Sequence, residues 1–185
     1  MTQQDSNLSA KAVVDFWREA GPQKWFNKDD AFDAQFKARF EAAHEAAASG
    51  ALDAWGTDAH GALALLVLLD QFPRNAFRNT ARTYATDGKA LEIARAAVDA
   101  GMDMQIEDPQ LRAFFYLPFM HSESLADQER SVALCRHAHP DNLRFAQHHR
   151  DIVARFGRFP HRNAMLGRTT TPEEQKFLDE GGFTG

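Results

Sequence analysis

The sequence predicts an all-α fold, a single compact domain of about eight helices. Apolar residues recur at helical spacing through nearly every segment of the 185 residues, and no segment sustains the alternation of a strand. Capping residues, glycines and prolines separate these segments at short intervals. Because no linker-like tract divides the chain, we expect one domain over residues 1–185, with residues 1–8 and 181–185 frayed at the ends.

The first half of the chain predicts four helices. Each begins at a residue whose side chain can accept a hydrogen bond from a free backbone N–H: Ser9, Asp29 or Asp30, Thr57 and Asp87. Three of them end at a glycine: Gly21, Gly50 and Gly101. The second helix carries a stripe of Phe32, Phe36 and Phe40, and the third is apolar on nearly all sides through Leu69. The third is therefore expected at the centre of the fold.

The second half begins with a helix at Asp108 and Pro109, which Pro118 should kink or end because proline clashes with the carbonyl four residues before it. Three more helices are expected to begin at Ser124, at Pro140-Asp141 and at the capping-box stretch 171–174. In the helix that follows Pro140, apolar and histidine side chains share one face: Phe145, His149, Ile152 and Phe156.

Composition and charge exclude several classes of protein. A formal net charge of −5 argues against nucleic-acid binding, because phosphate contacts need a basic surface. The most apolar run, 62–69, is too short to cross a bilayer, so we expect no membrane partner. The first ten residues lack the pattern of a secretory signal, and we expect a cytoplasmic protein. The single cysteine, Cys135, allows no internal disulfide and reads as a small buried hydrophobe.

No metal or other cofactor is expected. Glu41 and His44 have the spacing of di-iron helical bundles, but such bundles need a second copy of the motif and the chain has none. Four histidines lie between 137 and 149, but His148 and His149 are adjacent and diverge on a helix, and His139 precedes a proline near a helix end, so their number does not indicate a metal site.

Five stretches resemble a bacterial family catalogued as domain of unknown function 924. They are "DFW" (15–17), "KWF" (24–26), "LDQFPRN" (69–75), "FFYLPFMHSE" (114–123) and "RFGRFPHRNAMLGR" (155–168). The resemblance implies antiparallel helical hairpins like those of tetratricopeptide-repeat proteins, and it implies no activity and no catalytic residues. The chain departs from the family at Asn79, where a glycine is expected, and at Tyr84, where a phenylalanine is expected.

Two distant segments end alike, in Phe-Pro followed by basic residues and asparagine, at 72–75 and 159–163. Asp70 lies just before the first of these, in the last turn of an apolar helix, where burial and the helix dipole both disfavour a carboxylate. We therefore expect Asp70 to pair with a cation. Arg74 is four residues on, but Pro73 should break the helical spacing, which leaves Arg158 and Arg162 as alternative partners. In the structural interpretation, this pair clamps two helix ends together.

The functional interpretation makes the same region a binding surface for a small anionic ligand or an acidic peptide. Arginines crowd residues 150–168, where Asp151 is the single opposing charge, and guanidinium groups bind carboxylates and phosphates in pairs of hydrogen bonds. The expected contacts follow the two buried helix ends: Arg74, Asn75, Arg78, Arg158, Arg162 and Asn163.

The alternative is an enzyme of the hydrolase type that acts on a small anionic substrate. His121 would be the acid–base group, with Glu123 or Asp70 orienting it and the arginines binding the charge. A purely structural role for all these motifs is the third possibility. The enzyme hypothesis requires His121 and the arginines to meet in one concave pocket, and the sequence predicts no oligomeric state.

Overall fold

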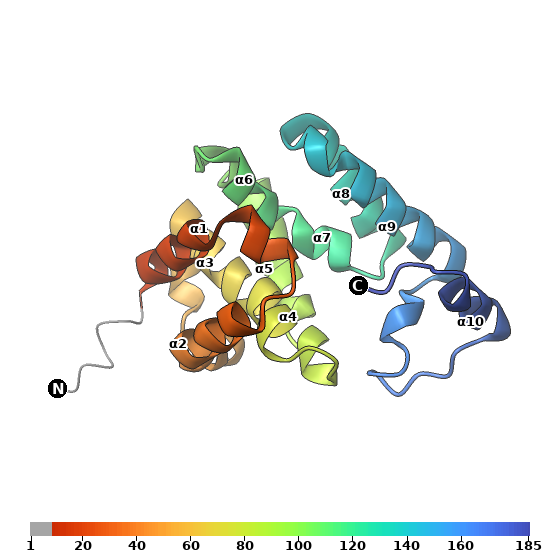
Figure 1. Ribbon diagram of the computed structural model, residues 1–185. Coiled ribbons are helices and arrows are strands. Elements are labelled where there is room, and N and C mark those ends of the chain that lie inside the picture. Colours follow the sequence, from red (N-terminus) through yellow and green to blue (C-terminus); the bar gives the residue numbers. More distant parts are fainter. Residues whose placement is uncertain (1–8) are drawn as a thin grey trace.

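The computed structural model describes residues 9–185, within which the regular secondary structure is helical and no strand occurs (Figure 1). The all-α prediction is confirmed. The α-helices are α1 (Ala10–Phe26), α2 (Asp30–Ser49), α3 (Ala59–Leu66), α4 (Phe72–Ala76), α5 (Asp87–Asp99), α6 (Pro109–Arg112), α7 (Leu117–His121), α8 (Leu125–Ala138), α9 (Leu143–Phe156) and α10 (Pro172–Asp179). Residues 1–8, expected to fray, lie outside the described residues.

Several helix starts confirm the capping predictions. The side chains of Ser9, Asp29, Asp108 and Thr171 each accept a hydrogen bond from a backbone N–H in the first turn that follows. The expected start at Thr57 is wrong by one residue. Asp58 caps α3 instead, because the Thr57 hydroxyl donates to the Ala54 carbonyl in the preceding 3-10 turn. Gly21 kinks α1 at a positive φ of 73°, and the helix then resumes as far as Phe26.

The predicted helix after Asp108 is interrupted. A 3-10 turn over Ala113–Phe115 separates α6 from α7, and Pro118 lies in the first turn of α7, where its missing N–H costs no hydrogen bond. This interruption, and the π-helical turn that separates α3 from α4, give more and shorter α-helices than the eight expected.

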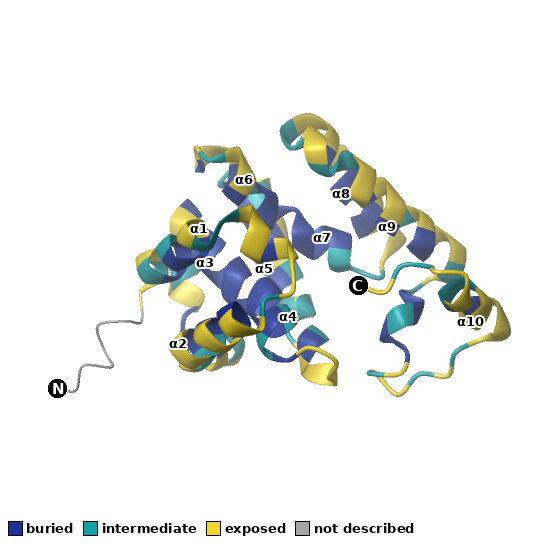
Figure 2. Cartoon of the chain, viewed as in Figure 1, coloured by how far each residue is buried: buried dark blue, intermediate teal, exposed yellow. Residues whose placement is uncertain are grey.

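The central position expected for α3 is confirmed, since Leu63, Leu65 and Leu66 are almost completely buried. Figure 2 shows the buried residues gathered on the inner faces of the helices. The Phe32, Phe36 and Phe40 stripe of α2 packs into the same large core. A smaller apolar cluster of Ile152, Val153 and Phe159 forms beside it, with Phe156, Phe177 and Phe183 packed around it. In Figure 1, α1 to α6 form one side of the molecule, and α8, α9 and α10 form the other.

The described residues contain no helix long and apolar enough to span a membrane. The cytoplasmic location and the tetratricopeptide-like pairing of helices stay predictions.

The join between α3 and α4 overturns the expectation that Pro73 breaks the helical spacing. Residues Val67–Gln71 form a π-helical turn, in which the Phe72 N–H donates to the Val67 carbonyl five residues before it. Pro73 has no N–H for the carbonyls four and five residues before it, those of Leu69 and Leu68. Side chains supply donors instead: the Thr86 hydroxyl lies 2.6 Å from the Leu69 oxygen, and His44 Nδ1 lies 2.8 Å from the Leu68 oxygen. The chain therefore stays helical through Arg74.

We expect Thr86→Val to lower the free energy of unfolding by about 1–3 kcal/mol, because valine keeps the shape but takes the hydroxyl donor from a buried carbonyl. Urea denaturation of Thr86→Val beside Thr86→Ser, which keeps the hydroxyl, measures this difference. Equal stability of the two variants would contradict the role assigned to the hydroxyl.

Candidate functional site

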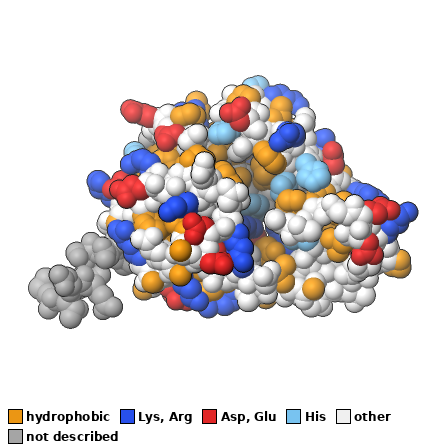
Figure 3. All heavy atoms as spheres, in the orientation of Figure 1, with side chains coloured by type: hydrophobic (Ala, Val, Ile, Leu, Met, Phe, Trp, Pro, Cys, Tyr) orange, Lys and Arg blue, Asp and Glu red, His pale blue; other side chains and the backbone are white. Residues whose placement is uncertain are grey.

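A pocket of about 510 Å³ lies between the two apolar clusters. One side comes from the end of α1 and from α4, and the other from α9 and the segment after it, with α7 between them. The face in Figure 3 is hollowed near its middle, where basic, histidine and hydrophobic side chains meet.

The structure brings four of the six predicted ligand contacts together. Arg74, Asn75 and Arg78 from the first Phe-Pro segment line the same pocket as Arg162 from the second. His121 also lines it, so the convergence that the enzyme hypothesis requires is present.

The other predicted contacts lie outside the lining. Arg158 pairs with Glu174 of α10 at 2.7 Å, and the buried Asn163 amide donates to the same carboxylate at 3.1 Å. Glu123 accepts from Arg168 at 2.7 Å and from the Phe159 backbone N–H at 2.8 Å. No hydrogen bond joins Glu123 to His121 among the described residues. These side chains hold the segment around 157–171 and α10 in place.

Asp70 is buried, as expected, but its cation is Arg74 rather than Arg158 or Arg162. Because the helix continues past Pro73, Arg74 Nη1 comes within 3.3 Å of Asp70 Oδ1 and donates to the Asp70 carbonyl at 2.8 Å. Gln71 Nε2 donates to the carboxylate at 2.6 Å. Burial raises the pKa of Asp70, but the charges and hydrogen bonds around it more than offset this and hold its pKa well below its usual range. Asp70 is therefore a carboxylate.

His121 lies against this carboxylate. Its Nδ1 is 2.7 Å from Asp70 Oδ1, and since an ionised carboxylate only accepts, Nδ1 carries the proton. Burial and the charge of Arg74 lower the pKa of His121, against the pull of Asp70. A neutral imidazole held through Nδ1–H leaves the Nε2 lone pair available, and Nε2 makes no hydrogen bond to any described residue. This is the arrangement of a histidine prepared to take a proton.

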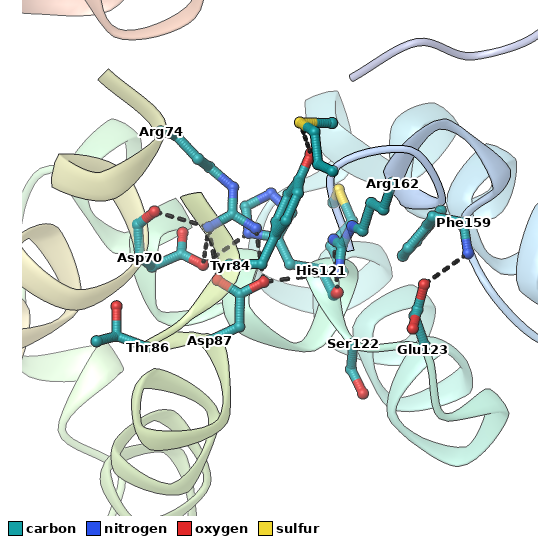
Figure 4. A network of polar contacts seen from close by, with 12 residues as sticks. Asp70, Arg74, Tyr84, Thr86, Asp87, His121, Ser122, Glu123, Phe159 and Arg162 are labelled. Atoms are coloured by element: carbon teal, nitrogen blue, oxygen red, sulfur yellow. Dashed lines mark hydrogen bonds and ion pairs between the residues drawn. The ribbon is translucent and has the colours of Figure 1, made fainter. Parts of the chain in front are cut away.

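Arg162 is the most unusual side chain of the pocket. Only 8% of it is exposed, and its guanidinium lies 4.5 Å from the Tyr84 ring centroid and 4.6 Å from that of Phe159. Nη2 donates to the His121 carbonyl at 2.9 Å, whereas the nearest carboxylate oxygen, on Asp87, is 3.6 Å from Nη1 (Figure 4). The buried Nε has no hydrogen-bond partner. Burial, with the nearby charge of Arg74, lowers the pKa of Arg162.

Arg74 already holds Asp87 through both terminal nitrogens, at 2.8 and 2.9 Å. Arg162 therefore shares a carboxylate that another arginine has engaged more closely.

Two further histidines line the pocket. Burial lowers the pKa of His149 to about 4 and that of His161 to about 3. Both are neutral at physiological pH, and the buried Nδ1 of His161 has no hydrogen-bond partner.

Sequence reasoning missed the aromatic part of the lining. Tyr84, noted there only as a departure from the family, covers one face of Arg162. Phe145 was placed with the apolar face of its helix, but it is 48% exposed and lines the pocket. Phe183, in the tail expected to fray, packs against His149 with ring centroids 4.6 Å apart. Fraying of 181–185 stays a prediction, and no sequence signal placed Phe183 here.

The left-handed backbone of Asn79, with φ of 61°, explains why glycine is expected at that position.

Within residues 9–185, no group of three or more His, Cys, Asp or Glu side chains is placed to hold a metal ion.

Comparison with known proteins identifies the family. A family model described as "Bacterial protein of unknown function (DUF924)" matches residues 13–182. A solved structure of a protein of unknown function, ATU0120 from Agrobacterium tumefaciens, is 53% identical, with a TM-score of 0.90 over 93% of this chain and 97% of that chain. No protein with a curated description matches. The chain therefore belongs to the DUF924 family of bacterial proteins, which confirms the resemblance carried by the five sequence stretches.

Proposed function

We propose that the pocket binds a small organic anion. The observation that carries the proposal is Arg162, a buried guanidinium that lines the cavity with an unpartnered Nε and a single long ion pair. Buried polar groups of native proteins nearly always have partners, so an orphaned donor in a cavity favours a ligand that accepts from it. A buried donor also suits a small molecule better than an acidic peptide, which reaches exposed side chains first.

The lining has the charge expected of such a site. Its ionisable side chains are three arginines, three histidines and Tyr84, and no Asp or Glu side chain is among the described residues that line it. The protein as a whole carries a net charge of −5, so this basic lining is local.

Organic carboxylates and phosphates should raise the melting temperature of the protein. A ligand at a hundred times its Kd adds about 2.7 kcal/mol to the free energy of unfolding. A thermal-shift screen of both classes on wild type, on Arg162→Met and on Arg155→Met tests the site. Arg155 is exposed and lies outside the pocket, so its variant should respond as wild type does. The absence of any anion-dependent shift in wild type would refute the proposal.

Acid–base catalysis in the same pocket is a second candidate function, favoured by the pair of Asp70 and His121. His121 Nε2 would take a proton from water as the oxygen adds to an ester carbonyl, and the imidazolium would return the proton to the leaving alcohol. The arginines would bind the charge of the substrate.

A 4-nitrophenyl monoester of a dicarboxylic acid, an anionic ester, provides the assay. We expect wild type to release nitrophenolate faster than buffer does, and His121→Asn to lose the activity. Asparagine places an amide N–H where Nδ1 lies, so the contact with Asp70 and the binding of the monoester should survive. Equal rates in the two proteins would leave His121 with a structural role.

A further inference from the structure

Resting on this anion site, we propose that its ligand is a monoanion, a carboxylate joined to a flat aromatic body. The charge balance, the two orphaned polar atoms and the exposed rings at the pocket each bear on this class of ligand.

The positive charges of the arginines that line the pocket are balanced by carboxylates outside the lining. Arg74 contacts Asp70 and Asp87, at 3.3 and 2.8 Å. Arg78 Nε donates to Asp33 at 2.8 Å. With Arg162, this makes three arginines against three carboxylates.

The histidines add no charge at neutral pH, since burial lowers the pKa of all three. The region is thus close to neutral overall, although its lining surface is basic. One negative charge can be accommodated there, whereas a second would bring a dianion close to Asp70 and Asp87 without a cation to match it. A carboxylate therefore fits better than a phosphate monoester.

Arg162 and His161 both line the pocket, and each has a polar atom without a partner that can donate to a carboxylate. Arg162 Nε–H is a donor with no acceptor, and neutral His161 has an unpartnered Nδ1, which donates in one of its tautomers. The arginine sits between two rings in a buried position, where a charge-assisted hydrogen bond is stronger than in water.

The apolar part of the lining indicates an aromatic body. Phe26 and Phe145 are 60% and 48% exposed, among the most exposed large hydrophobic side chains of the described residues, and both line this pocket. Phe26 is the last residue of α1, on one side of the molecule, and Phe145 lies in the first turn of α9, on the other side. Exposed rings gathered at a cavity are typical of a ligand-binding surface. A flat ring would cover them by stacking or edge contacts.

Four probes separate the charge from the aromatic body: 2-naphthoate, 2-naphthyl phosphate, 2-naphthalenemethanol and acetate. At about pH 8 the phosphate is a dianion, because its second pKa is about 6. Calorimetric titration of the full chain should give 2-naphthoate an affinity roughly tenfold or more above each of the others.

Any other order of affinity among the four probes would overturn the inference. Tighter binding of naphthyl phosphate would assign a dianion, and equal binding of acetate would remove the aromatic requirement, while the anion site itself stands in both cases. Equal binding of the alcohol, or no binding of any charged probe, would refute the anion site as well.

The aromatic contribution has its own variant. Phe26→Ala with Phe145→Ala should weaken the binding of 2-naphthoate roughly tenfold and leave that of acetate unchanged, because these two lining rings are assigned to the aromatic body and not to the carboxylate. Leu125→Ala, an exposed apolar residue outside the pocket, is the matched control. Unchanged naphthoate affinity in the double variant would contradict the aromatic body.

Discussion

Asp70→Ala is expected to lower the free energy of unfolding by about 3–5 kcal/mol at neutral pH, because it removes the carboxylate from a buried ion pair and leaves its partners uncompensated. Arg74 would keep Asp87, the closer of its two carboxylates, but would lose the Asp70 carboxylate at the α3–α4 join. Gln71 and His121 would each lose an acceptor.

The contribution of Asp70 to the free energy of unfolding should fall as the pH is lowered. Its pKa in the folded protein is lowered, so its stabilisation is fully present above the unfolded pKa of about 3.9 and is lost as the pH falls toward the folded value. The difference in unfolding free energy between wild type and Asp70→Ala should therefore be constant from about pH 5 upward and shrink below about pH 4.

Urea denaturation across this range measures the difference. Asp151→Ala removes an exposed carboxylate that pairs with Arg150, and it should change stability by less than about 0.5 kcal/mol. An equally small effect of Asp70→Ala would contradict the stabilising ion pair and would leave the orientation of His121 as the role of Asp70.

Local chemistry made most of the fold predictable from sequence. Ser9, Asp29 and Thr171 act within one turn of their own positions, and their caps form as expected. The need of Asp70 for a cation also follows from burial alone. Its partner did not, because Arg74 reaches it only through a π-helical turn whose carbonyls are paired by His44 and Thr86, from distant elements.

The pocket was less predictable from sequence than the fold, because it depends more on contacts between distant elements. The repeated Phe-Pro segments indicated that Arg74 and Arg162 lie near each other, and they do. The exclusion of Arg158 follows from its pairing with Glu174 in α10, a contact that no spacing in the sequence reveals. Phe26, at the end of the kinked α1, enters the lining through tertiary packing.

Arg162→Met is expected to weaken the binding of 2-naphthoate by roughly a hundredfold, because it removes the charge and the unpartnered donor assigned to the carboxylate. Its effect on stability should be small, within about 1 kcal/mol of wild type. Burial lowers the pKa of Arg162, so the folded protein already disfavours its charged form.

The small cost in stability has a structural basis. Removal of the buried charge offsets the lost hydrogen bond to the His121 carbonyl, and a methionine side chain can pack between Tyr84 and Phe159. Calorimetry and urea denaturation on the same samples separate binding from folding, with Arg155→Met as the matched change at an exposed arginine. A folded Arg162→Met that binds normally would remove Arg162 from the site. If Arg162→Met unfolds, Arg162 is needed for the stability of the fold. A residue that mainly binds a ligand can be replaced with a larger loss of binding than of stability.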